Sequence, residues 1–145
     1  MHFGKVIHST CQLYDENDLD MDWITENDLN TEYKVMPYLN GWIKFRRDYS
    51  IKIMSIEQKL YSEQYNFAGR HDRVIIINEY TMLDIKSYVN SKTGADLQTA
   101  GYTILWDENN PLEKIRERIV VRLVPVLQQP LTNFIVHPPG TAKTK

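Results

Sequence analysis

The chain has 145 residues, of which 42% are hydrophobic and 25% are charged, and its formal net charge is −2. These values fit one compact domain and exclude both a disordered chain and a chain with two full-sized domains. No apolar run approaches the roughly 20 residues of a transmembrane helix, and the first residues lack a signal-peptide layout. We therefore expect a cytoplasmic protein without a membrane partner. The single cysteine, Cys11, excludes a disulfide framework and a multi-cysteine metal site.

The charges are distributed unevenly along the chain. Residues 15–28 contain seven acidic residues and no lysine or arginine, so that the remainder holds 17 basic residues against 12 acidic ones. We expect the acidic stretch to be a solvated connector. Its alternately spaced aspartates suggest a calcium loop, but Trp23 and Leu29 stand where the EF-hand pattern needs glycine and glutamate, which excludes that site.

The predicted elements begin with two helices. The first covers Gly4 to Tyr14, and the second lies within 30–48, where Pro37 stands in the first turn or kinks it. Strands are expected over 51–61 with a bend near Ser55, over 67–77 and over 81–87, followed by a helix over 95–106, a loop over 107–111, and strands over 119–124 and 132–136. The apolar residues 74–77 indicate a strand covered on both faces. This order predicts an α/β fold with a small mixed sheet flanked by helices.

Asp72, Asp84 and Lys86 form the most informative pattern. If the turn between their strands is centred on Asn78, paired residue numbers sum to 156, and Asp72 stands opposite Asp84 with Cβ atoms roughly 5 Å apart. Strand alternation places Lys86 on the same face as Asp84. Two opposed carboxylates repel each other unless a cation lies between them, and Mg²⁺ or Mn²⁺ prefers such oxygen ligands.

Lys86 can orient or deprotonate an attacking water beside these carboxylates. The alternative interpretation is a salt-bridged patch on a solvent-facing hairpin. It is disfavoured because the flanking strand is predicted to be buried, and buried charges require a partner.

Other candidate residues have ambiguous patterns. Glu57, on the preceding strand, either reaches the same site or faces outward. Gln98 and Tyr102 have i, i+4 spacing on the predicted helix, where an amide and a phenol contact a phosphate or a base, or are simply half-buried. His8 shares a helix face with Gly4, although a lone histidine is usually packed or solvated.

Two basic clusters are compatible with a nucleic-acid partner. Their members are Lys44, Arg46, Arg47 and Lys52 in the first, together with Tyr49, and Arg116, Arg118 and Arg122 in the second. The first cluster indicates either a groove that follows a DNA backbone or a solvated helix end whose cations suit the helix dipole. The second indicates DNA contacts or an oligomer interface.

Four short motifs together resemble the PD-(D/E)XK nuclease superfamily, specifically its RecB-like exonuclease branch. They are GKVIH at 4–8, AGRHD at 68–72, LDIKS at 83–87 and LQTAGY at 97–102. The resemblance covers roughly residues 4–106. It implies a restriction-endonuclease-like core and a single nuclease-like domain over residues 1–137, and the composition and terminal position of residues 138–145 predict a flexible tail. Arg70 and His71 depart from the second motif, where small or apolar residues are usual.

The resemblance also implies roles for individual residues. Metal ligands would be His8, Asp72, Asp84 and the Ile85 carbonyl; the catalytic set would be Asp72, Asp84, Lys86 and Glu57; substrate contacts would come from Gln98, Tyr102, Arg46 and Arg47. The implied activity is that of a stand-alone, phage-type exonuclease that uses Mg²⁺ or Mn²⁺ to hydrolyse linear, end-bearing DNA in replication or recombination.

Alternative functions, partners and a compartment accompany the same resemblance. A structure-specific or nicking endonuclease of the same fold is one alternative function, and a non-catalytic DNA-binding subunit is the other. A single-strand annealing or binding protein and a second copy of this chain are partners that the resemblance allows. If the protein is phage-encoded, its compartment would be the host cytoplasm.

Overall fold

The computed structural model describes residues 3–20, 22–24, 34–87 and 95–125. The chain forms two compact units, of which one comprises Met1–Ile51 with Leu123–Lys145 and the other comprises Lys52–Arg122. We describe each unit separately. The predicted strand over 132–136 and the predicted tail over 138–145 lie outside the described residues, and the single domain over residues 1–137 stays a prediction.

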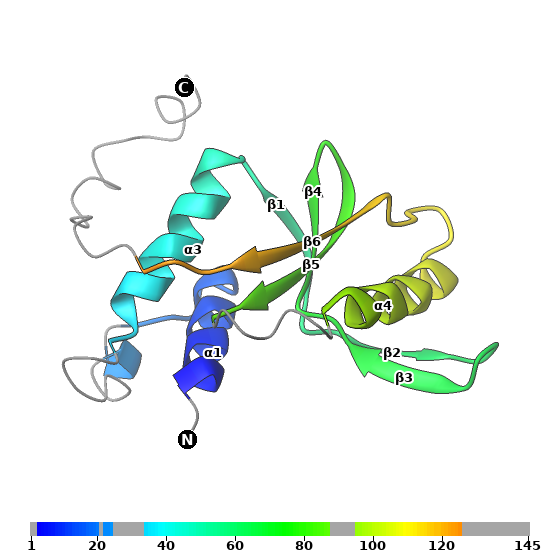
Figure 1. Cartoon of the computed structure of the whole chain (residues 1–145), viewed down its shortest axis with the longest axis horizontal. Helices are drawn as coiled ribbons and strands as arrows, with labels where there is room; N and C mark the ends of the chain where they lie inside the picture. Colours follow the sequence, from blue (N-terminus) through cyan, green and yellow to red (C-terminus); the bar gives the residue numbers. More distant parts are fainter. Residues whose placement is uncertain (1–2, 21, 25–33, 88–94, 126–145) are drawn as a thin grey trace. The chain divides into compact units, whose positions relative to one another are not determined.

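The first unit contains the two helices predicted at the start of the chain. Helix α1 spans Phe3–Asp15 and α3 spans Met36–Asp48 (Figure 1). Pro37 stands in the first turn of α3, where its missing N–H would have no helical partner anyway. No helix among the described residues is long and apolar enough to cross a membrane.

The prediction that residues 15–28 form a solvated acidic connector is wrong for the first of them, Asp15. Its side chain has no exposed surface, accepts a hydrogen bond from Trp42 Nε1–H at 2.9 Å, and pairs with Arg46 at 2.7 Å. Burial of this carboxylate is tolerated because both partners compensate its lost hydration. Glu16 and Asp18, which follow directly, are exposed as expected.

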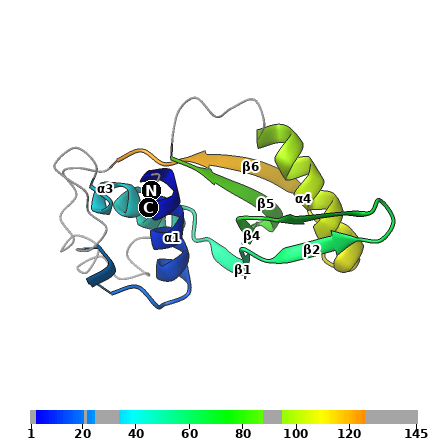
Figure 2. The same ribbon diagram turned by 90° about the horizontal axis from the view of Figure 1, so that it is seen from below.

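The second unit is built on a four-stranded sheet. Its strands lie in the order β1 (Lys52–Ile56), β4 (Arg73–Ile77), β5 (Glu79–Lys86) and β6 (Glu117–Arg122). The β5 and β6 strands are parallel and the other neighbours are antiparallel. Helix α4 (Ala95–Asn109) packs against β5 and β6 (Figure 2). The prediction of an α/β fold with a mixed sheet is thereby confirmed in its coarse form.

A two-stranded ribbon completes the second unit. It consists of β2 (Lys59–Ser62) and β3 (Phe67–Arg70), joined by the turn 63–66, and α4 packs against both strands. The ribbon extends beside α4 in both ribbon views (Figures 1 and 2). The sequence predicted one strand over 51–61 and one over 67–77, and each is broken in the structure. Strand β2 follows the break in the first, and β3 precedes the break in the second.

The two breaks lie next to each other. The first is at Glu57, which has a left-handed φ of 49°, and the second is at His71 and Asp72. The Glu57 N–H donates to the Asp72 carbonyl at 3.0 Å, which joins the breaks. The predicted bend near Ser55 is confirmed by a register shift between Ile53 and Ser55.

Helix α4 is longer than predicted. It continues to Asn109, so the predicted loop over 107–111 begins only at Asn110. The side-chain amide of Asn109 donates to the Leu105 carbonyl at 2.8 Å, and that of Asn110 donates to the Trp106 carbonyl at 3.1 Å. These bonds add side-chain donors to two carbonyls of the last turns and so favour the helical conformation there. Strand β6 begins two residues earlier than predicted.

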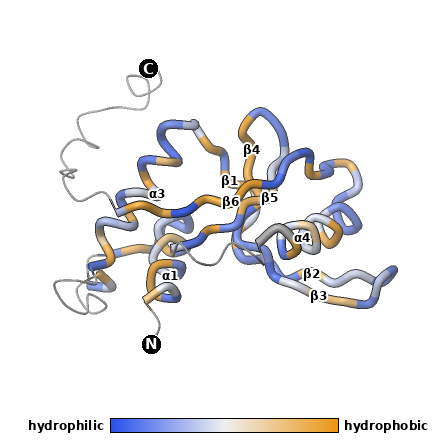
Figure 3. Tube along the Cα trace, viewed as in Figure 1, coloured by the Kyte–Doolittle hydropathy of each residue, from blue (hydrophilic) through white to orange (hydrophobic). Residues whose placement is uncertain are grey.

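The core of the second unit lies where α4 covers the sheet. Val74, Met82 and Trp106 form a buried apolar cluster there. Hydrophobic residues colour much of β4 orange in Figure 3, whereas the far end of the ribbon is blue. The prediction that 74–77 are buried on both faces holds for Val74 and Ile75, while Ile76 and Ile77 are half-buried.

Candidate metal and phosphodiester site

The hairpin register that the sequence predicts is present. Strands β4 and β5 pair from Arg73 with Leu83 to Ile77 with Glu79, so paired numbers sum to 156. Asn78 at the turn has a φ of 69°, which suits a tight hairpin. Asp72 directly precedes β4. Continuing the register by one pair beyond Arg73 and Leu83 places Asp72 opposite Asp84.

Asp72 is held by hydrogen bonds at both its side chain and its backbone. Its Oδ2 accepts from the Ile85 N–H at 2.7 Å. Its carbonyl accepts from the Glu57 N–H at 3.0 Å and from Arg73 Nη1 at 2.8 Å. The carboxylate is therefore fixed against the strand that carries Asp84.

Asp84 is a buried acid beside a second carboxylate. Only 4% of the residue is exposed. Burial, and then the neighbouring Asp72 carboxylate, raise the pKa of Asp84 to about 6, and the Lys86 ammonium opposes part of this shift. The Asp84 Oδ2 atom makes no directed hydrogen bond, although Lys86 Nζ lies 3.1 Å from it. We interpret this pair as an electrostatic contact with poor hydrogen-bond geometry.

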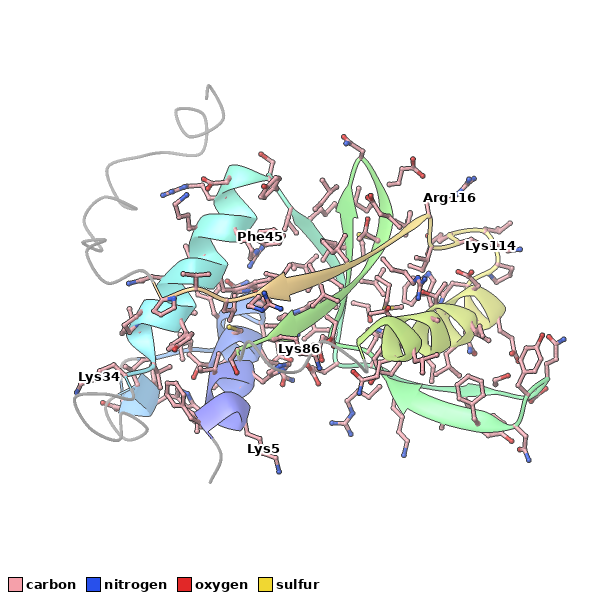
Figure 4. The ribbon with its side chains drawn as sticks, viewed as in Figure 1. Lys5, Lys34, Phe45, Lys86, Lys114 and Arg116 are labelled. Carbon is pink, nitrogen blue, oxygen red and sulfur yellow. The ribbon has the colours of Figure 1, made fainter. Side chains whose placement is uncertain are left out.

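Lys86 lies between Asp84 and helix α4. Its Nζ is 3.4 Å from Gln98 Oε1, so Gln98 acts as an acceptor for this ammonium. Figure 4 labels Lys86 at the end of β5, on the side where α4 begins. The structure thus brings together three residues that the sequence predicted for the site.

Tyr102 lies one helical turn beyond Gln98 and faces the acidic group. Burial, and then the charges of Asp72, Asp84 and Glu57, raise the pKa of Tyr102 above its ordinary value. The phenol therefore stays protonated and keeps its O–H. Its position explains the glycine of the second motif, because a Cβ on Gly69 would lie 3.2 Å from Tyr102 Cε1.

Arg73 was missed by the sequence analysis. Its side chain is fully buried, and its Nη1 lies 3.4 Å from Glu57 Oε2 and 2.8 Å from the Asp72 carbonyl. Its position in the sequence, between Asp72 and an apolar run, could have indicated a buried arginine. A buried guanidinium needs an acidic partner nearby. Glu57, which sequence reasoning left open, has a structural partner in Arg73. Its catalytic role stays a prediction.

His71 explains one departure from the second motif. Its ring is buried, lies 2.8 Å from Ser55 Oγ through Nε2, and packs edge-on against Trp106. Burial, and then the charge of Arg73, lower the pKa of His71 to about 4, so the ring is neutral near pH 7. His71 is part of the packing between α4 and the sheet.

The remaining predicted residues belong to other parts of the chain. His8 is on α1, and Arg46 and Arg47 are on α3, all in the first unit. Arg46 pairs with Asp15, so one of its guanidinium nitrogens already has an acceptor. The ligand role of His8 and the substrate-binding roles of both arginines stay predictions.

The donor set of the second unit fits a hard divalent cation. Asp72 and Asp84 offer carboxylate oxygens on one side of the β4–β5 hairpin, and Asp84 Oδ2 is buried without a directed hydrogen bond. Such an oxygen loses its hydration and is compensated only in part by the Lys86 ammonium 3.1 Å away, whereas a coordinated cation would compensate it further.

No protein-family model matches the chain, and no curated protein matches it in sequence.

Proposed function

We propose that this protein is a metal-dependent deoxyribonuclease of the PD-(D/E)XK kind, with exonuclease action on linear DNA as the first expectation. The observation that carries the proposal is the buried Asp84 carboxylate, which lies beside Asp72 and 3.1 Å from Lys86. A solvent-facing salt bridge would not need this burial. An acid retained where its ionised form is disfavoured is typical of a functional site.

Three of the four motifs, those at 68–72, 83–87 and 97–102, support the proposal through the physical role that each has in the second unit. Gly69 allows Tyr102 to approach, Asp72 and Asp84 supply the acids, and Lys86 is supported by Gln98. These explanations rest on contacts and not on the resemblance itself. We also propose a restriction-endonuclease-like core, on the basis of the antiparallel β4–β5 hairpin followed by α4 and the parallel strand β6.

The mechanism assigns each side chain a separate task. Asp72 and Asp84 would hold Mg²⁺ or Mn²⁺, which when bound stabilises negative charge on the scissile phosphate and lowers the pKa of a nearby water. Lys86 orients the attacking water with its ammonium and offsets phosphate charge. Burial, and then the charges of Asp72, Asp84 and Glu57, raise the pKa of Tyr102, so its neutral O–H can donate to a phosphate oxygen.

Product lengths over time provide the test. The wild-type protein is incubated with end-labelled linear DNA, single-stranded and duplex, and with closed circular DNA, in Mg²⁺, Mn²⁺ or EDTA. The proposal expects cleavage with a divalent cation and none in EDTA. Short products released progressively from linear ends support the exonuclease, whereas digestion of the circle supports the endonuclease alternative. Binding of DNA without cleavage in either metal overturns the proposal and favours the non-catalytic subunit.

A further inference from the structure

The β2–β3 ribbon has one covered face and one bare face. Residues whose side chains are half-buried or buried against α4 alternate with exposed ones along both strands. The exposed set, which we name the ribbon face, is Lys59, Tyr61, Ala68 and Arg70. Because the ribbon has two strands and α4 packs on one side of it, the ribbon face is available to a partner.

Two cations stand directly opposite each other on the ribbon face. Lys59 is the cross-strand partner of Arg70, and like charges in this position destabilise a strand pair. Within the described part of the chain neither residue makes an ion pair, and the ribbon face contains no acid. An anion placed between the two cations would attract both and offset their mutual repulsion, so the pair is suited to bind a phosphate.

An exposed aromatic ring lies beside the cations. Tyr61 is 49% exposed and follows Lys59 by two residues on the same face. Its hydroxyl donates to Asn66 Oδ1, which restrains the ring without covering it. Tyr65, in the turn at the end of the ribbon, is 60% exposed. A restrained, exposed tyrosine next to paired cations is the combination that stacks a base while the phosphates are held.

The end of the ribbon is held in shape by the protein itself. Glu108 of α4 accepts hydrogen bonds from the Ser62 hydroxyl at 2.6 Å and from the Glu63 N–H at 2.9 Å. Asn109 of α4 donates to the Tyr61 carbonyl at 3.1 Å. The ribbon is therefore preorganised, and binding of a partner would not have to order it.

We propose that the ribbon face binds single-stranded DNA, with phosphates at Lys59 and Arg70 and an unpaired base stacked on Tyr61. The inference rests on the proposed function and names the substrate contact that serves it. Arg70 precedes Asp72 by two residues, so their Cα atoms are at most about 7 Å apart. The ribbon face therefore begins two residues along the chain from the acidic site. A single strand is favoured over duplex because its bases are exposed to an aromatic ring.

The test measures binding separately from cleavage. Fluorescence anisotropy with a labelled 20-nucleotide oligo-dT, in EDTA, compares the wild type with Lys59→Gln, Arg70→Gln, Tyr61→Ala and Tyr61→Phe. Tyr61→Ala should weaken binding about tenfold without changing its salt dependence, and Tyr61→Phe should retain most of the affinity. Each cation variant should weaken binding and reduce the slope of log K against log salt by about 0.7.

Lys114→Gln is the matched control, because Lys114 is exposed in the loop between α4 and β6 (Figure 4) and lies outside the ribbon face. It should bind the oligonucleotide like the wild type. Wild-type affinity in Tyr61→Ala and in both cation variants overturns the inference, as does an equal effect of Tyr61→Ala on duplex binding. All substituted side chains are exposed, so thermal melting should show folded variants.

Hydrolysis of bis(4-nitrophenyl) phosphate by the wild type, with Mn²⁺, separates the two proposals. This small diester has no strand for the ribbon face to hold. Hydrolysis together with unaltered oligonucleotide binding by the ribbon variants overturns the ribbon inference alone. Absence of hydrolysis of both this diester and DNA, together with ribbon-dependent binding, overturns the nuclease proposal alone.

Discussion

The Asp72 carboxylate accepts a hydrogen bond from the backbone N–H of Ile85 at 2.7 Å. The bond ties the residue that precedes β4 to the residue that follows Asp84 on β5. It holds the Asp72 side chain beside the buried Asp84.

We expect Asp84→Asn to stabilise the metal-free protein at neutral pH. The pKa of Asp84 is about 6 in the folded protein against 3.8 as its ordinary value. The folded state is therefore penalised progressively as the pH rises from about 4 to about 6, and fully above that. Because asparagine carries no charge, the variant should gain on the order of 2 kcal/mol at pH 7.5.

Urea unfolding in EDTA at pH 7.5 and pH 4 measures this difference. The difference in unfolding free energy between Asp84→Asn and the wild type should vanish at pH 4, where Asp84 is protonated in the folded protein. Glu79→Gln is the matched control, because Glu79 begins the same strand and is exposed. Equal unfolding free energies of Asp84→Asn and wild type at pH 7.5 would contradict the burial argument.

Two glycine-to-alanine substitutions should have opposite effects. A Cβ on Gly69 would lie 3.0 Å from Leu105 Cδ1 and 3.2 Å from Tyr102 Cε1, so Gly69→Ala should cost about 1–3 kcal/mol and displace the tyrosine. A Cβ on Gly101 in α4 would meet Phe67 at 3.9 Å, which is an ordinary contact. Gly101→Ala should therefore stabilise the helix by up to about 1 kcal/mol. Thermal unfolding of both variants gives the sign of each change in stability. A destabilised Gly101→Ala variant beside a Gly69→Ala variant that is not destabilised would contradict the prediction.

The ion pair between Glu57 and Arg73 should be structural. Arg73→Met should cost about 3 kcal/mol, because it leaves Glu57 without this partner and removes the bond to the Asp72 carbonyl. Glu57→Gln should cost less, and the double variant should cost less than the sum of the two. A double-mutant cycle by urea unfolding measures the coupling. Strict additivity would show that Glu57 is retained for another reason, such as metal binding.

The Glu108 carboxylate should control the end of the ribbon. The Ser62 hydroxyl, followed by the backbone N–H groups of Glu63 and Gln64, lowers the pKa of Glu108. Its stabilising contribution is therefore present above its ordinary pKa of 4.5 and is lost as the pH falls through the lower folded value. Glu108→Ala should accelerate hydrogen exchange at residues 63–66 at pH 7. Unchanged exchange there would show that the turn is held by other contacts.

The sequence predicted the register of the β4–β5 hairpin because its determinants are local. Asn78 tolerates the left-handed turn, and the alternation of Leu83 and Asp84 sets the faces of β5. Helix α3 was also predictable, since the helical spacing of Tyr38, Trp42 and Phe45 is a property of neighbouring residues. The elements that carry Asp84, Lys86, Gln98 and Tyr102 could thus be placed before the structure was known.

The breaks at Glu57 and Asp72 could not be placed in the same way. They depend on the burial of Arg73 and on a hydrogen bond between residues 15 positions apart, and no local pattern reveals that bond. The burial of Asp15 has the same origin, because its partner Arg46 lies 31 positions away. Sequence reasoning therefore fails where a polar residue is buried by a distant partner.

The rate of Mg²⁺-dependent cleavage of end-labelled linear DNA tests the central claim most directly, with wild type, Asp84→Asn and Lys86→Gln compared with Glu79→Gln and Lys114→Gln. The account expects both site variants to lose at least about 100-fold in rate while remaining folded, because each removes a group that acts on the reacting phosphate or water. Both control variants should cleave DNA like the wild type. Undiminished cleavage by folded Asp84→Asn and Lys86→Gln would contradict the account.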